Sequence, residues 1–177
     1  MTWLKTHKKQ VFTWLLILAT LGCQIFIFSN SLRDGEESAK QSGIVVELVK
    51  PPVEQLLPAV KVEPTEQNIV RFVRKAAHFL EFALLGCLCC FTARRFTEKK
   101  GLFLTLPLGY AVLTAFADEG IQLLSAGRAG RLTDVLIDSA GAVTGLLFAF
   151  GCLALWGYFR KRKDKNKVTH KNTEEMK

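Results

Sequence analysis

Charge is absent from two of the four long apolar runs in this 177-residue chain. Residues 11–28 (VFTWLLILATLGCQIFIF) and 102–117 (LFLTLPLGYAVLTAFA) contain no Asp, Glu, Lys or Arg. A helix of a soluble bundle carries a polar face toward water, and these two runs have almost no polar face. Their composition therefore argues against a soluble four-helix bundle.

All four runs suit a membrane. The other two lie at 76–93, with one acid and one histidine, and at 135–159, whose only charge is Asp138. About 20 helical residues span the hydrocarbon core of a bilayer. The third run is short, but Asp118 and Gln122 can continue its helix to the membrane surface. We therefore predict an all-α, polytopic membrane protein with four transmembrane helices, at about 11–29, 76–93, 102–118 and 135–159.

Basic residues gather on one side of these predicted spans. The N-terminus, the loop after the second span and the tail carry 15 basic and four acidic residues, against nine and twelve in the rest of the chain. Basic flanks stay in the cytoplasm, so we predict that both termini are cytoplasmic. The predicted order is a cytoplasmic N-terminus (1–10), a membrane domain (11–155) with an outer segment (30–75), and a basic cytoplasmic tail (160–177). Such flanks explain the basic charge without nucleic-acid binding.

Several missing signals exclude classes of site and processing. No small-x-small cleavage site follows closely behind the first run, which argues against a cleaved signal peptide. All five cysteines lie inside apolar runs, and Cys87-x-x-Cys90 lacks the flanking ligands of a zinc or redox motif, so we expect small buried hydrophobic residues. The chain also shows no serine–histidine–acid order and no strict metal-binding motif.

Local patterns predict one helix start and one packing surface. Thr65 followed by Glu66 predicts a helix with Thr65 as its N-cap, beginning about two turns outside the membrane. Residues 42–50 fit either a short amphipathic helix on the outer surface or a loop that caps the bundle. In the fourth run, Gly141-x-x-x-Gly145 predicts close packing against a partner helix.

The polar residues that interrupt the runs all fall at the outer ends of the predicted spans. They are His78 and Glu81 in the second span, Asp118, Glu119 and Gln122 in the third, Arg128 in the next loop, and Asp134 and Asp138 in the fourth. Ionisable groups at membrane depth face the bundle interior and pair with one another. Residues four apart share one helix face. We therefore predict an outward-facing polar pocket.

Two kinds of chemistry fit the pocket. The candidates for acid–base catalysis, or for a divalent metal, are His78, Glu81, Asp118 and Glu119. The candidates for substrate binding are Lys75, Gln122, Arg128, Asp134 and Asp138. Arg128, together with Arg131 and Arg74, suits a phosphate or pyrophosphate head group. The alternative is a structural network of ion pairs that fixes helix packing. These residues specify neither a cofactor nor the identity of a metal.

Three stretches resemble the VanZ-like family of bacterial membrane proteins. They are Phe28-Ser29-Asn30-Ser31, RKAAHFLEFALLG at 74–86 and FADEGIQLLSAGRAGRLTDVLIDSAGAVTG at 116–145. The last stretch matches the family's DE-x-x-Q, GR, D and G with Asp118-Glu119, Gln122, Gly127-Arg128, Asp134 and Gly141.

The resemblance implies a cell-envelope role in the cell membrane, since the family's namesake is associated with resistance to teicoplanin, a lipoglycopeptide antibiotic that targets cell-wall precursors. Membrane lipids and lipid-linked cell-wall precursors, or other polar head groups, are then the expected partners. No biochemical activity follows from the resemblance. An enzyme, a non-catalytic binder of head groups and a membrane scaffold all stay open.

Overall fold

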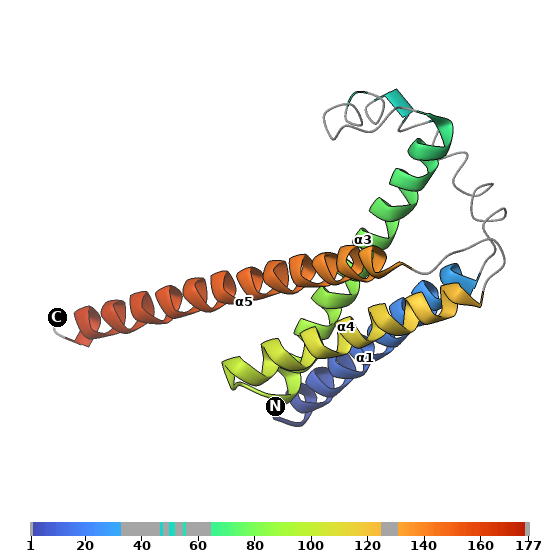
Figure 1. The fold of residues 1–177 in the computed structure, drawn as a ribbon. Coiled ribbons are helices and arrows are strands. Elements are labelled where there is room, and N and C mark those ends of the chain that lie inside the picture. The colour runs from blue at the N-terminus through green and yellow to red at the C-terminus, as the bar shows by residue number, and fades with distance from the viewer. Residues whose placement is uncertain are drawn as a thin grey trace.

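The computed structural model describes residues 2–32, 65–124 and 131–175, with a few further positions between 47 and 55. In these ranges the chain forms four long helices and no strand: α1 (Thr2–Leu32), α3 (Glu66–Phe96), α4 (Lys100–Leu123) and α5 (Leu132–Glu175) (Figure 1). The predicted all-helical fold class is confirmed. Arg128 and most of the predicted surface segment 42–50 lie outside the described residues.

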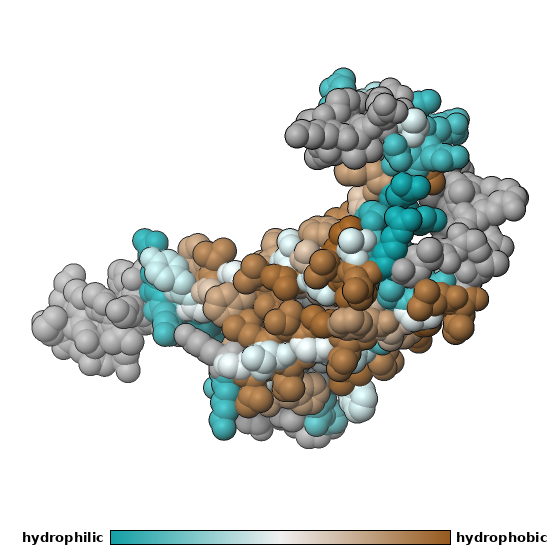
Figure 2. Space-filling view, in the orientation of Figure 1, coloured by the Kyte–Doolittle hydropathy of each residue, from teal (hydrophilic) through white to brown (hydrophobic). Residues whose placement is uncertain are grey.

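Each long helix can cross a membrane by its length and composition. The candidate spans are His7–Leu32, Glu66–Phe96, Gly101–Gln122 and Leu132–Lys163, and each contains one predicted span. Large apolar side chains are exposed along these helices, for example Ile25, Leu113 and Phe148. Figure 2 shows them as a wide apolar band with hydrophilic residues beyond it. An apolar surface of this extent fits contact with lipid, as the four-span prediction requires.

The arrangement centres on α3, which contacts each of the other three helices. It runs antiparallel to α1, because Thr20 pairs with Thr92 (3.2 Å) while Asn30 pairs with Glu81. It runs parallel to α5, whose residues follow those of α3 in the same order along their contact. α4 runs parallel to α1, because Tyr110 contacts Gln24 while Gln122 lies beside Ser31. Successive helices therefore alternate in direction, and α1 begins on the side of the bundle where α5 leaves it.

Backbone contact between α3 and α5 depends on glycine. A Cβ atom placed on Gly141 would overlap the carbonyl oxygen of Phe79, and one on Gly145 would overlap that of Ala83. From the other side, Gly86 of α3 faces the carbonyl group of Ala142 in the same way. Small residues allow helix backbones to approach this closely. The helix that packs on Gly141 and Gly145 is thus α3 of the same chain.

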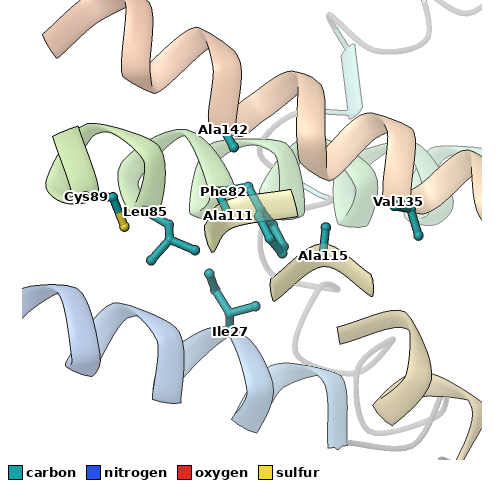
Figure 3. Packing of buried hydrophobic residues seen from close by; sticks show 8 residues of the cluster. All are labelled: Ile27, Phe82, Leu85, Cys89, Ala111, Ala115, Val135 and Ala142. Atoms are coloured by element: carbon teal, nitrogen blue, oxygen red, sulfur yellow. The ribbon is translucent and has the colours of Figure 1, made fainter. Parts of the chain in front are cut away.

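A compact apolar cluster joins all four helices beneath this crossing (Figure 3). The side chain of Phe82 is fully buried at its centre, with Ile27 of α1 on one side. The partners from α4 and α5 are largely small, including Ala111, Ala115 and Ala142. Small partners let four helices converge on one aromatic ring.

Both ends of α3 are held by polar contacts. At its start, Thr65 accepts a hydrogen bond from the backbone N–H of Asn68 (3.4 Å), which confirms the predicted N-cap. At its other end, Arg95 donates to Thr13 Oγ1 (3.0 Å) and to the carbonyl oxygen of Lys9 (3.1 Å). Arg94 lies nearby and pairs with Glu98 at 3.7 Å. Basic residues therefore gather at this end of the bundle.

The close helix crossing makes a testable prediction. Gly145→Ala forces a methyl group into the α3 backbone, so the free energy of unfolding should fall by about 1–3 kcal/mol, as for other overpacked cores. The measurement is the fraction of purified protein that stays monodisperse in detergent after heating.

Gly151→Ala on the same helix is the matched control, because nothing lies within 4 Å of its added Cβ. It should match or slightly exceed the wild type in thermal stability, since Ala is favoured over Gly in helices. Equal loss in both variants would contradict the proposed role of the crossing.

Candidate functional site

The buried polar residues gather at the end of the bundle opposite Arg94 and Arg95. Of the seven buried polar or charged residues in the described part of the chain, five lie at this end: Ser31, Asp118, Glu119, Gln122 and Asp138. All but α3 contribute to that set, and α3 adds the half-buried His78 and Glu81. We call this region the acidic end.

At its centre, three helices bring together one histidine and two aspartates. Ligand-capable atoms of His78 (α3), Asp118 (α4) and Asp138 (α5) all lie within 4.8 Å of one another. Asp118 is 0% exposed and Asp138 is 2% exposed. We call these three residues the central group. Imidazole nitrogen with carboxylate oxygen can exchange protons with a substrate or bind a divalent metal.

Asp118 uses only one of its carboxylate oxygens. Its Oδ2 accepts a hydrogen bond from Nε2 of Gln122 (2.8 Å), and that nitrogen lies 3.5 Å from Oγ of Ser31. The other oxygen, Oδ1, is buried and has no hydrogen-bond partner among the described residues. A buried acceptor without a partner is destabilising, so this oxygen is placed to receive something further.

Glu81 lies between the central group and α1. Its Oε1 accepts a hydrogen bond from Nδ2 of Asn30 (2.9 Å), and its Oε2 lies 3.6 Å from Nδ1 of His78. A carboxylate beside one ring nitrogen restricts the orientation and tautomer of an imidazole. Glu81 is therefore a positioning residue for His78.

Two further acids hold the start of α5. Glu119 accepts a hydrogen bond from the backbone N–H of Arg131, the residue directly before that helix. Asp134 in its first turn forms an ion pair with Lys75 of α3. An acid in the first turn also interacts favourably with the helix dipole. Glu119, Asp134 and Lys75 thus make structural contacts at the edge of the central group.

Negative charge dominates the acidic end. Asp118, Asp134, Glu119 and Glu81 all lie close enough to repel a charge on Asp138. Lys75 is engaged with Asp134, and Arg131 is exposed. Repulsion between like charges is stronger away from water. The described part of the site therefore favours a cation over a bare anion.

The sequence-predicted residues divide into four sets. The structure brings His78, Asp118 and Asp138 together, and places Glu81 and Gln122 in contact with them. It places Glu119, Lys75 and Asp134 at the edge, whereas Arg128 lies outside the described residues.

Sequence reasoning missed two residues, Asn30 and Ser31, which α1 contributes to the site. The sequence contained two features that could have identified them. They end the first apolar run at its predicted outer side and belong to the Phe28-Ser29-Asn30-Ser31 stretch that carried the family resemblance.

A family model described as VanZ/LLP1 matches residues 12–156, which is most of the chain. The chain belongs to the VanZ/LLP1 family. No curated protein and no solved structure matches it. The matched range contains every described residue of the acidic end, so the site lies within the family's own domain. This VanZ/LLP1 protein is a multi-pass membrane protein with four apolar helices.

The ion pair at the edge of the site makes a second prediction. Because the side chains of Lys75 and Asp134 are 31% and 24% exposed, their coupling should stabilise the protein by about 0.2–1 kcal/mol. The measurement is a double-mutant cycle with Lys75→Met, Asp134→Asn and the double variant, read as unfolding free energy in mixed micelles. Strictly additive losses would show that this pair does not couple α3 to α5.

Proposed function

We propose that this VanZ/LLP1 protein lies in the bacterial cell membrane and acts on the polar head group of a lipid-linked cell-wall precursor at the outer leaflet. The observation that carries the proposal is the central group, in which Asp118 and Asp138 are buried beside His78. Charged groups at membrane depth are costly and mark functional sites. A change in wall precursors would also link the protein to resistance to lipoglycopeptides such as teicoplanin.

The charge distribution supports an outward-facing site. Arg94 and Arg95 lie at the end of the bundle opposite the acidic end, and the C-terminal part of α5 extends beyond that same end with many further basic residues. Basic flanks are retained in the cytoplasm. Both termini are then cytoplasmic, and the acidic end lies at the outer surface, where head groups of the outer leaflet reside.

The chemistry we assign is acid–base catalysis. His78 is the candidate proton donor or acceptor, and Glu81 fixes its orientation. Asp118 and Asp138 are candidates to bind or orient the reacting group, directly or through a cation.

A second candidate function is a membrane scaffold. Two interactions favour the scaffold because they hold helix ends in place. They are the ion pair of Lys75 with Asp134 and the hydrogen bond from the backbone N–H of Arg131 to Glu119.

The orientation can be measured with single added cysteines at the two ends of α3. Gln67→Cys and Glu98→Cys place thiols at exposed positions. A membrane-impermeant maleimide should label Gln67→Cys in intact cells and should label Glu98→Cys only after permeabilisation. The wild type, whose five cysteines are free, supplies the background. The reverse labelling pattern would place the acidic end in the cytoplasm.

The activity can be tested by mass spectrometry of envelope lipids and wall precursors. Cells would express the wild type, His78→Gln, Glu98→Gln or no protein, at matched membrane levels. We expect a mass change with the wild type that falls about 100-fold or more in His78→Gln, the usual size of an acid–base contribution. Teicoplanin susceptibility, measured in the same strains, should follow the mass change.

Glu98→Gln is the matched control, since Glu98 is an exposed carboxylate at the far end of α3. It should retain the full mass change. Glu119→Gln is less informative, because Glu119 holds the backbone at the start of α5. Identical profiles for all strains, with each protein folded, would favour the scaffold.

A further inference from the structure

We propose that the central group binds one divalent transition-metal ion, Zn²⁺ or Mn²⁺, with His78, Asp118 and Asp138 as its protein ligands. The three side chains come from three helices, and their ligand-capable atoms lie within 4.8 Å of one another. The purpose of the ion rests on the proposed function, whereas its binding is a separate property of these residues.

The donor set selects the class of metal. One imidazole nitrogen with two carboxylate oxygens suits Zn²⁺ or Mn²⁺ better than Ca²⁺ or Mg²⁺, which prefer oxygen alone. At metal–ligand distances of about 2.0–2.2 Å, neighbouring ligand atoms lie roughly 3 to 3.5 Å apart. Small side-chain rotations from the observed spacing therefore suffice to close the site around an ion.

An unsatisfied buried oxygen points independently to a ligand. Asp118 is completely buried, and its Oδ1 has no hydrogen-bond partner among the described residues. Leaving such an oxygen unpaired inside a membrane protein is unfavourable. A bound cation would supply the partner that Asp118 lacks.

The local charge also favours a cation. Asp118 and Asp138 are joined by Glu81, Glu119 and Asp134 in one mutually repelling set. Lys75 already pairs with Asp134 at the edge. A divalent ion between the two aspartates would convert their repulsion into attraction, most strongly where water is excluded.

Neighbouring residues hold the ligands in place. Gln122 donates a hydrogen bond to Oδ2 of Asp118, which leaves Oδ1 for the ion. Glu81 lies 3.6 Å from Nδ1 of His78. Histidines that bind metals commonly direct their second ring nitrogen at a carboxylate, and Glu81 is placed to be that carboxylate.

Three protein ligands leave at least one coordination position for another group. Catalytic metal sites keep such a position open, whereas structural sites fill it with a fourth side chain. A water molecule or a phosphate oxygen of a lipid head group is the expected occupant. The ion would thereby allow an anionic head group to enter a site whose own residues would repel it.

Metal binding can be measured without any assay of activity. Full-length protein purified in detergent would be stripped with EDTA, dialysed against Zn²⁺ or Mn²⁺, and its metal content determined by mass spectrometry. We expect one ion per chain. Titration with Mn²⁺, followed by electron paramagnetic resonance, should show binding at least about tenfold weaker in Asp138→Asn, because losing even a supporting residue weakens metal sites 10- to 100-fold.

Glu98→Gln is again the matched control, because it removes one carboxylate far from the central group. It should bind Mn²⁺ as the wild type does. If Asp138→Asn is not monodisperse, His78→Gln replaces it in the titration. Failure of the wild type to bind either metal at micromolar concentrations would overturn the proposal, as would unchanged affinity in the folded variants. A wild type that changes envelope lipids without binding metal would refute the ion alone, and one that binds metal without changing lipids would refute the proposed function alone.

Discussion

The arrangement of the acidic end depends on the contact between the backbones of α3 and α5. Gly141 lies against the carbonyl group of Phe79, and Phe79 directly follows His78 in α3. Asp138 lies one helical turn before Gly141 in α5. The same close approach that packs the two backbones thus brings Asp138 to His78. A larger residue at the glycine would separate the helices and move the aspartate away from its neighbours.

The acids of the acidic end differ in how the described residues pair them. Asp134 has a lysine, and Glu119 has a backbone N–H on one oxygen. Glu81 has Asn30 on one oxygen and His78 at 3.6 Å from the other. Asp118, the most buried of these acids, accepts one hydrogen bond, which the side-chain amide of Gln122 donates. A network built only to fix helix packing would place its best-paired charges where burial is greatest. Asp118 instead keeps one oxygen without a hydrogen-bond partner among the described residues.

Much of the fold followed from the sequence because lipid leaves few alternatives: long uncharged runs must form spanning helices. The gathering of the polar residues at one end of the bundle was also predictable, because spans that alternate in direction bring these ends together. The rotation of each helix did not follow. Asp118 and Glu119 are adjacent, yet α4 turns about 100° between them, so one joins the central group and the other contacts Arg131. From the sequence, Asp118 and Glu119 were grouped together and Asp138 was assigned to substrate binding. The rotation of α5 that brings Asp138 to His78 depends on the contact of its glycines with the backbone of α3, and the sequence does not specify that contact.

The charge balance of the site also narrows the possible ligands. An anionic head group meets at least two buried aspartates at the central group, so its direct binding there is opposed by electrostatics. A neutral sugar or peptide would meet no such barrier, but it would leave the repulsion between Asp118 and Asp138 unrelieved. A divalent cation neutralises these two carboxylates and offers an open coordination position to an incoming phosphate oxygen. The metal and the head group are therefore linked through one physical requirement, which is the neutralisation of carboxylates held at membrane depth.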